Sequence, residues 1–416
     1  MKKSILITIT FCLTIFQLAT AQKTVSLVTT DIDNFWQAYD KIVATKDTTA
    51  QFDYLNKLFL DRATPGQKAM IQARRYTPKN YIDAINQRQT YFNSIRNNTF
   101  KANDYAKTIA AKVEVLRKLY PGLRPAKIYF TVGAFRSGGT TLADMVLIGS
   151  EIAMADEHLE NLVFTNIHEY VHTQQKSTVC DNLLGQSVME GVAEFITEKA
   201  MGNNSTLPAI AYGRQNVEKV RQVFARQMFN IDYGFWLYSD AESEFGLRDL
   251  GYYVGYAIAE AYYGRAKDKM EAIKEMIEVD ANNEKELAAY VDQSGYFDKS
   301  YNSLKEDYEK NRPKVLSVYP FETGKLISPA TTKFTINFSV PMNKRSKNFE
   351  LGPLGMDYLI RVKTFIGFST DGKSAEFEMD QLKPNRHYQL LIGQGFRDLN
   401  GIRIKPYLID FKTGEK

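Results

Sequence analysis

Two of the four histidines in the chain are four positions apart, in the run His168-Glu169-Tyr170-Val171-His172. On a helix, residues at i and i+4 lie on one face, one turn apart. Both imidazoles can then reach a single Zn²⁺ at about 2.0–2.1 Å. Glu169 projects beside them, where it can take a proton from a zinc-activated water. The spacing therefore predicts a zinc site capable of hydrolysis.

A catalytic zinc site usually has three protein ligands and leaves one position for water, so a further donor is needed. Glu190 follows His172 by eighteen residues and begins the run Glu190-Gly191-Val192-Ala193-Glu194. We predict that Glu190 is the third ligand, supplied by a second helix whose small residues permit close packing. Glu194 lies one turn later on the same face and can accept the other N–H of a ligating histidine.

This combination resembles the gluzincin clan of metallopeptidases, which join His-Glu-x-x-His on one helix to a glutamate ligand on the next. An acidic residue follows that ligand by four positions, as Glu194 follows Glu190. The sequence is also similar to bacterial proteins described only as predicted Zn-dependent proteases. The resemblance covers roughly Lys127 to Arg265. It implies one bound Zn²⁺ and a peptide or protein substrate.

Other metal patterns fit the sequence less well. The metzincin extension would need glycine at Gln175 and histidine at Thr178, and neither is present. Asp181 is an alternative acidic ligand, but it falls in an expected connector without a supporting acidic partner. A structural or vestigial zinc site, and a coincidental match, are the remaining alternatives for the motif.

A residue that stabilises the transition state should lie elsewhere in the chain, because zinc polarises only one side of the developing oxyanion. Aminopeptidase-like gluzincins carry a Tyr-x-x-Gly helix downstream, and the resemblance implies this role for Tyr252, in the run Tyr252 to Gly255. The alternative is packing. Gly251 and Gly255 at i and i+4 are also typical of a tight helix crossing, and tyrosine is readily buried.

The remaining histidines and the cysteine downstream of the motif favour ordinary roles. We interpret His158 as a surface or capping residue, His387 as part of the C-terminal region, and Cys180 as a buried thiol rather than a metal donor. An extended substrate can bind by adding a strand to a sheet edge. Gluzincins use an edge strand upstream of the zinc helix, so the resemblance implies this role for 127–135 or the segment just after it; an ordinary internal strand is the alternative. The clan's Gly-x-Met-Glu-Asn run is missing, so aminopeptidase activity is not favoured, and endopeptidase or another specificity stays open.

The elements that must position these residues follow from periodicity and turn signals. From Asp31 to about Leu119 the sequence reads as helical and predicts a packing scaffold that walls one side of a cleft. Strands are expected at 127–135 and 145–148, with a turn at 136–139 between them. A helix should run from about Asp156 through His172, and a second should end at Gly202. Further amphipathic helices fit 214–228, 247–265 and 267–277.

The composition changes near Pro313, where short strand-like runs begin. They are separated by turn signals, and their spacing predicts a β-sandwich of about 100 residues. The runs Phe338-Ser339-Val340-Pro341-Met342 and Asp398 to Gly401 resemble those of bacterial Ig-like modules. That resemblance implies spacing or adhesion, with contacts to the envelope or to other proteins. The expected strands are 314–319, 333–338, 358–364, 375–379, 388–392 and 407–411.

The first residues predict an export signal. Lys2 and Lys3 precede a mostly apolar stretch, 5–18, and Ala19-Thr20-Ala21 gives a small-x-small cleavage pattern, so we expect the mature chain to begin at Gln22. The apolar stretch is too short for a comfortable membrane span, which needs about 20 residues. We therefore expect no stable membrane insertion after cleavage.

Charge and cysteine content narrow the class of protein further. Loss of 1–21 removes two lysines and no acidic residue, which lowers the net charge from +5 to +3. A net charge of +3 over so long a chain is too small to favour nucleic acid as a partner. Only Cys180 remains after cleavage, so the mature chain can form no internal disulfide. Export without disulfides suits a bacterial envelope or secreted protein.

Together these features predict an α+β protein: a mostly helical zincin-like metallopeptidase domain with a small β-sheet, followed by an Ig-like β-sandwich. The expected divisions are 1–21 for the signal peptide, 22–312 for the metallopeptidase domain, with a helical part to about 120, and 313–416 for the sandwich. The expected function is an exported, periplasmic or secreted zinc peptidase. The alternatives are a non-catalytic zinc-binding envelope or adhesion protein on the same scaffold, and a zinc amidase acting on cell-wall peptide.

Overall fold

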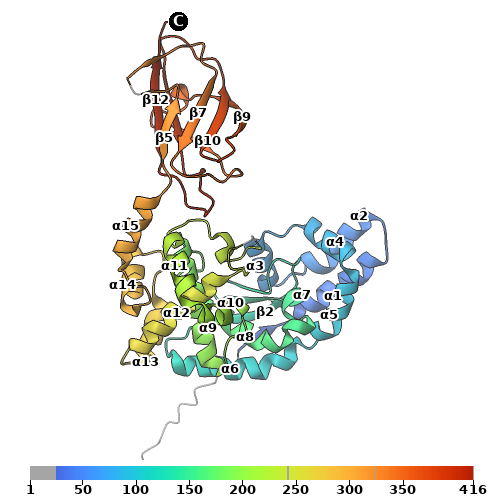
Figure 1. Ribbon diagram of the computed structural model, residues 1–416. Coiled ribbons are helices and arrows are strands. Elements are labelled where there is room, and N and C mark those ends of the chain that lie inside the picture. Colours follow the sequence, from blue (N-terminus) through green and yellow to red (C-terminus); the bar gives the residue numbers. More distant parts are fainter. Residues whose placement is uncertain (1–24, 241–242, 323, 416) are drawn as a thin grey trace, which may run out of the picture.

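The computed structural model describes residues 25–416 apart from 241–242, 323 and 416, so the expected signal peptide lies outside the described residues. A largely helical body comes first in the chain, and a strand-rich sandwich follows it (Figure 1). The predicted fold class is therefore confirmed.

Helices build the first part of the chain, as predicted. Their apolar faces bury aromatic residues such as Phe35, Trp36 and Phe92, which form one cluster of ring contacts. Thr64 caps one helix and is followed by proline at its first turn, so Pro65-Gly66 begins an element rather than ending one. The helices are α1 Thr30–Val43, α2 Thr48–Leu55, α3 Pro65–Arg74, α4 Pro78–Gln87, α5 Gln89–Thr99 and α6 Ala106–Leu119.

A four-stranded sheet, in the order β1-β2-β4-β3, carries the edge that borders the site. β1 Leu27–Val28, β2 Lys127–Thr131 and β4 Met145–Gly149 are parallel, and β3 Gly139–Leu142 pairs antiparallel with β4 at one edge. Two expectations were wrong here. The strand expected to reach residue 135 ends at Thr131, and Gly139 begins a strand instead of closing a turn. The run Gly-Thr-Thr-Leu is too short and too polar to show strand periodicity.

Two helices carry the zinc motif and cross a third. α8 Leu162–His172 follows a 3-10 helix over Asp156–Asn161, so the single helix expected from Asp156 is two elements. α9, Leu183–Met201, is capped by Gly202, whose φ of 74° closes the helix as predicted. α12, Leu250–Arg265, lies directly against α9, because a Cβ atom on Gly191 would come within 2.0 Å of the backbone of Gly255.

The later helices complete the body. The helix expected over 214–228 is α11, Val217–Gln227; it begins later than expected because Asn216 separates it from α10, Pro208–Gln215. The helix expected at 267–277 is α13, Lys269–Glu278. α14 Glu284–Ser294 and α15 Tyr301–Asn311 follow, and α15 leads into the sandwich (Figure 1).

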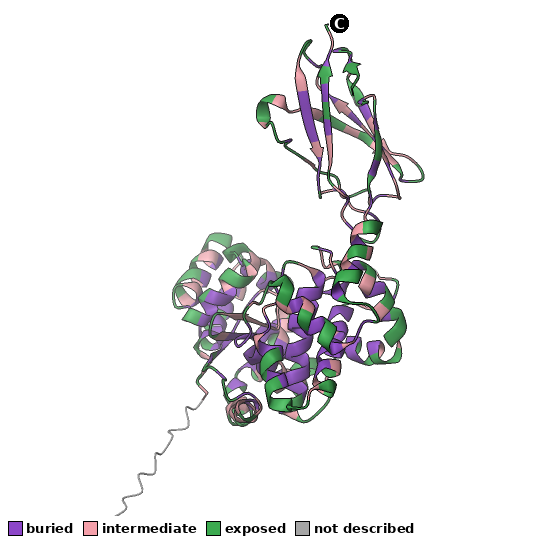
Figure 2. Ribbon diagram, turned by 90° about the vertical axis from the view of Figure 1, so that its left-hand side faces the viewer, coloured by how far each residue is buried: buried purple, intermediate pink, exposed green. Residues whose placement is uncertain are grey.

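The sandwich has two four-stranded sheets, in the orders β5-β7-β10-β9 and β6-β12-β11-β8. Buried residues alternate with partly buried ones, most clearly in β7 and β10, as expected for a sheet with one face in the core. The expected boundary at 313 stays a prediction; it lies between Leu304 of the first core and Val315 of the second. The helical body and the sandwich each contain buried residues of their own (Figure 2). The strands are β5 Val315–Tyr319, β6 Leu326–Ile327, β7 Lys333–Phe338, β8 Phe349–Glu350, β9 Val362–Phe368, β10 Ser374–Met379, β11 His387–Ile392 and β12 Tyr407–Thr413.

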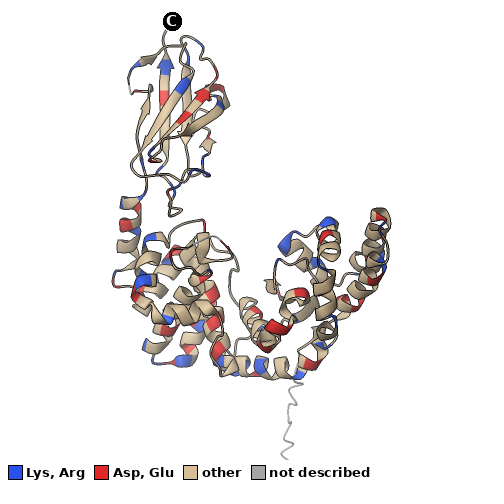
Figure 3. Cartoon of the chain, turned by 45° about the vertical axis from the view of Figure 1, so that its right-hand side comes forward, with Lys and Arg blue, Asp and Glu red and all other residues tan. Residues whose placement is uncertain are grey.

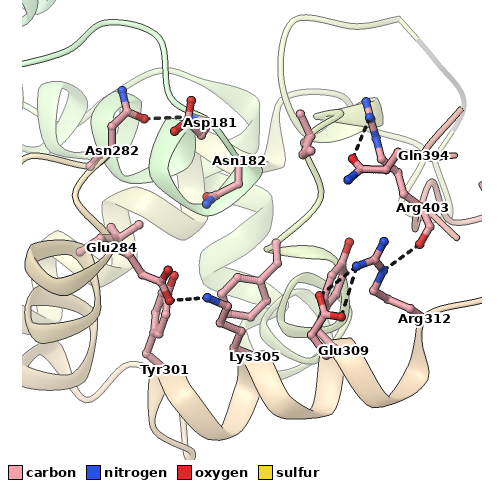
Figure 4. A pocket seen from close by; sticks show the side chains of 15 residues that line it. Asp181, Asn182, Asn282, Glu284, Tyr301, Lys305, Glu309, Arg312, Gln394 and Arg403 are labelled. Atoms are coloured by element: carbon pink, nitrogen blue, oxygen red, sulfur yellow. Dashed lines mark hydrogen bonds and ion pairs between the residues drawn. The ribbon is translucent and has the colours of Figure 1, made fainter. Parts of the chain in front are cut away.

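The sandwich contacts the segment that connects α11 to α12. Asp232 Oδ2 lies 2.7 Å from Arg397 Nη1 and 3.1 Å from Arg403 Nη2. Figure 4 shows the neighbouring pocket, where Arg403 also meets Gln394 and Arg312 donates to the Arg403 carbonyl at 3.1 Å. The segment that bears Asp232 is therefore held by ionic contacts from the sandwich.

Charges of both signs are interspersed over the body and the sandwich (Figure 3). Within the described part of the chain, every helix is too short or too polar to span a membrane.

Candidate metal centre

His168, His172 and Glu190 converge at one buried point. Nε2 of His168 lies 3.0 Å from Nε2 of His172, and Oε2 of Glu190 lies 3.3 Å and 3.2 Å from these two nitrogens. A tetrahedral zinc ion with bonds of about 2.0–2.1 Å would place its ligand atoms about 3.3 Å apart. The three side chains could thus hold a metal ion, and their spacing fits Zn²⁺.

The charge of this cluster also fits a cation. Burial opposes ionisation of Glu190, but the imidazoles of His172 and His168 outweigh it and hold its pKa well below the usual range. Burial likewise opposes charging of the imidazoles, yet the neighbouring glutamates raise the pKa values of His168 and His172 above normal. A buried carboxylate that stabilises positive charge on both histidines would stabilise a divalent cation in the same place.

The second ring nitrogen of each histidine faces an oxygen. Nδ1 of His172 lies 2.6 Å from Oε1 of Gln175. Nδ1 of His168 lies 2.9 Å from Oε2 of Glu194, within ion-pair distance, although the pair does not form a regular hydrogen bond. Both contacts favour a proton on Nδ1 and a free lone pair on Nε2, which is the state a metal needs. Glu194 therefore lies beside the ring nitrogen of His168 that faces away from the triad.

Sequence reasoning missed two residues that hold the triad. Gln175 lies three positions after His172, at helical spacing, so that spacing could have indicated it. Tyr238 gave no such signal, because it lies in an irregular segment far from the motif. Its phenol donates to Oε1 of Glu190, and burial together with Glu190 raises its pKa well above the usual range, so it stays a donor. Its φ of 59° is strained for a non-glycine residue.

Glu169 lies beside the triad and against the sheet edge. A Cβ atom at Gly139 would lie 2.6 Å from Oε1 of Glu169, so any larger side chain at this position of β3 would push the carboxyl group aside. Burial raises the pKa of Glu169, against the opposing effect of the two histidines. A carboxylate with a raised pKa is better matched to proton transfer near neutral pH than an exposed one.

Tyr252 reaches the same site from α12. Its ring centroid lies 6.2 Å from that of His168 and 6.3 Å from that of Tyr238. Burial and the nearby Glu190 raise its pKa well above the usual range, so the phenol remains a donor. Gly255 has a packing role of its own, because a Cβ atom there would lie 1.6 Å from the carbonyl oxygen of Ser187 on α9. The run from Tyr252 to Gly255 therefore has a physical basis for both interpretations, a catalytic role of Tyr252 and close packing of α12 against α9.

The other residues weighed as donors lie apart from the triad. His158 is exposed, and Nε2 of His387 lies 2.6 Å from Oδ1 of Asp410 in the sandwich. Cys180 is a buried free thiol whose pKa burial raises to about 12, which makes it a poor metal ligand. Asp181 binds Asn282 through its backbone N–H. Among the residues that the structure describes, the cluster whose ligand atoms are spaced for a metal ion consists of His168, His172 and Glu190.

Two connected cavities flank the triad, and Gly139, Glu169, Arg248 and Tyr252 line both. The first, of about 500 Å³, has a largely apolar lining that includes Ile152, Phe164, Leu207, Pro208 and Leu247; we call it the apolar half of the cleft. The second, of about 560 Å³, follows β3 and contains Arg74, Arg136 and Arg248; we call it the basic half. The site is thus open on both sides of the triad.

Two family models match the chain. Residues 103–284 match the family described as predicted Zn-dependent protease (DUF2268), and residues 309–413 match the bacterial Ig-like domain. Both resemblances drawn from the sequence are thereby confirmed. The first match contains the whole triad, Glu169 and Tyr252, whereas Arg74 lies outside it.

No curated protein matches the chain. Among solved structures, the crystal structure of the S-layer protein rSbsC(31-844) is 14% identical, with 94% of this chain and 46% of that one covered and a TM-score of 0.21. The structure of the N-terminal part of the bacterial S-layer protein SbsC is also 14% identical, with 93% and 77% covered and the same TM-score of 0.21. The chain thus spans less than half of the first structure, and a TM-score of 0.21 does not indicate a shared fold.

Proposed function

We propose that the chain is an exported zinc-dependent peptidase in which His168, His172 and Glu190 hold one Zn²⁺ and Glu169 is the general base. The observation that carries the proposal is the buried convergence of two imidazole nitrogens and one carboxylate oxygen within 3.3 Å of one another, beside a second buried carboxylate. Zn²⁺ in such a site supplies Lewis acidity, which polarises a carbonyl oxygen and lowers the pKa of water to about 7.

The residues around the triad have separate roles in this proposal. Glu169 takes a proton from the attacking water and returns it to the amine that leaves. Tyr252, a protonated phenol beside His168, donates a hydrogen bond to the oxyanion that develops on the substrate carbonyl. Glu194 and Gln175 keep the proton of each ligating imidazole on Nδ1.

The substrate would bind along β3, the free edge of the sheet. The N–H of Gly149 donates to the carbonyl of Gly138 at 2.9 Å, so Gly138 faces β4. Alternate residues of an edge strand face away from its partner, which turns the backbone groups of Gly139 and Thr141 toward the cleft. A peptide added there passes Glu169, because Gly139 lies against that carboxylate. The predicted substrate strand, given as 127–135 or the segment after it, corresponds in this proposal to β3.

Export and surface residence belong to the same proposal. They rest on the signal sequence expected at 1–21 and on the Ig-like match at 309–413, a module that suits contact with other envelope components.

The test uses purified full-length chain after signal removal. We expect about one zinc per chain, digestion of a proteome-derived peptide library, loss of cleavage on chelation, and recovery when zinc is restored. Purified cell-wall material, digested in parallel, separates a peptidase from a wall amidase. Bound zinc without turnover on either substrate would support the non-catalytic alternative and contradict the proposal.

A further inference from the structure

The basic half of the cleft contains a cation that the described residues leave without a carboxylate partner. Arg74, at the end of α3, makes one weak hydrogen bond, from Nη2 to the carbonyl of Gly139 at 3.4 Å. Its Nε is buried and has no hydrogen-bond partner in the described part of the chain. Arg74 and Glu169 line the same cavity. A half-buried, unpaired guanidinium beside a general base is costly unless a ligand completes it.

Arg136 adds a second uncompensated charge to this half. It donates from Nη1 to the carbonyls of Arg74 and Arg75, at 2.8 Å and 3.0 Å, and stacks over Tyr76. These partners fix the guanidinium without neutralising it. Arg248, in contrast, forms ion pairs with Asp240 and Asp249. The acidic residues that line this half are Glu169 and Glu190, which belong to the candidate metal centre.

The direction of a bound peptide follows from the sheet. β3 runs from Gly139, which both halves share, to Leu142, which lies in the basic half. Antiparallel pairing is the more stable arrangement for a strand added to an edge. A peptide so placed has its N-terminal part along Thr141 and Leu142 and its C-terminal part in the apolar half.

Resting on the proposed peptidase function, we infer that the substrates are acidic peptides, with Asp or Glu N-terminal to the cleaved bond and bound by Arg74, and an apolar residue after that bond. Arg74 is then a specificity-determining residue supplied from outside the segment that matches the protease family. Guanidinium suits this role because it presents several N–H donors to one carboxylate.

The first test is cleavage-site profiling on a proteome-derived library. The wild type should show enrichment of Asp and Glu on the N-terminal side, and Arg74→Gln should lose it, whereas Arg74→Lys should keep part of it. Arg75→Gln removes the same charge from the exposed neighbouring residue and should leave the profile unchanged. Cleavage without acidic enrichment, or enrichment that survives Arg74→Gln, would overturn the inference while the proposed function stands.

The second test measures binding without turnover. A labelled peptide with glutamates before an apolar residue, and its glutamine counterpart, are titrated into zinc-loaded Glu169→Gln protein. The glutamate peptide should bind about tenfold more tightly, a preference typical of one charged hydrogen-bonded contact, and Arg74→Gln in the same background should abolish the difference. Equal affinities of the two peptides for the Glu169→Gln protein that keeps Arg74, or a preference that survives Arg74→Gln, would overturn the inference. Preferential binding with no cleavage in the library would instead contradict the proposed function and leave the binding site intact.

Discussion

The phenol of Tyr238 donates a hydrogen bond to one carboxylate oxygen of Glu190, while the other oxygen of Glu190 faces both imidazoles of the triad. A residue in an irregular segment thus fixes the carboxylate that joins α9 to the histidines of α8. Residues that orient a ligand in this way typically change metal affinity by 10–100-fold when they are removed.

Tyr238→Phe should weaken zinc binding by about tenfold, because the Glu190 carboxylate loses the donor that orients it. Zinc affinity, measured by competition with a chelator, checks this. Tyr233→Phe is the matched control, since the Tyr233 phenol donates to the Cys180 carbonyl rather than to Glu190. Equal zinc affinities in the two variants would show that Tyr238 does not support the metal.

Asp232→Asn should weaken zinc binding several-fold, although Asp232 does not contact the triad. Its ion pairs with Arg397 and Arg403 hold the segment that reaches Tyr238, so their loss should let that phenol leave Glu190. The control is Asp298→Asn, which breaks an exposed ion pair with Arg221 and should have no effect. Zinc affinity is measured by the same chelator competition. An unchanged zinc affinity of the Asp232→Asn protein would contradict this link between the sandwich and the metal site.

The sequence was sufficient to predict the triad because helix geometry alone places His168 and His172 on one face. Glu190 and Glu194 share a face of the next helix for the same reason. The alternating strands of the sandwich were also predictable, since one face of each sheet is buried.

The rest of the site depends on contacts between residues far apart in the chain. Tyr238 reaches Glu190 from a loop, and Arg74 lines the neighbouring cavity from α3. Neither residue has a local pattern that indicates its place. Gly139 marks the sheet edge only once Glu169 is known to lie against it. The contacts of such residues follow from how the helices and strands pack together, and sequence periodicity does not predict that packing.

Tyr252→Phe should lower kcat per bound zinc by about 10²-fold, because the oxyanion loses a donor. Zinc content enters the comparison because the Tyr252 phenol also interacts with Glu190. Steady-state kinetics on a peptide cleaved by the wild type, with zinc measured on the same samples, checks this. Tyr263→Phe, about three turns further along α12, is the control. Unchanged kcat with a lower melting temperature would favour the packing role of Tyr252 over the catalytic one.

Glu151 should make stability depend on pH. Burial raises its pKa to about 7, although the backbone N–H groups of Gly133 and Phe135 act against this. Because the folded-state pKa lies above the unfolded one, the stabilisation is fully present below about pH 4.5 and is lost as the pH rises through 7.

Relative to Glu151→Gln, the wild type should therefore lose roughly 3 kcal/mol of unfolding free energy between about pH 4.5 and pH 8. Urea unfolding followed by tryptophan fluorescence measures it, since Trp36 and Trp236 both lie in the core of the helical body. Parallel pH curves for the two proteins would mean that Glu151 ionises normally.

The most direct test of zinc-dependent peptide hydrolysis compares the wild type with Glu169→Ala on a proteome-derived peptide library. Zinc is measured on both proteins. Glu169 is not a ligand in the proposed site, so both should carry about one zinc per chain, while cleavage should be confined to the wild type. An exposed-site variant, Glu160→Ala, prepared in parallel should cleave as the wild type does. Cleavage by Glu169→Ala at the wild-type rate, with contaminating peptidases excluded, would contradict the mechanism.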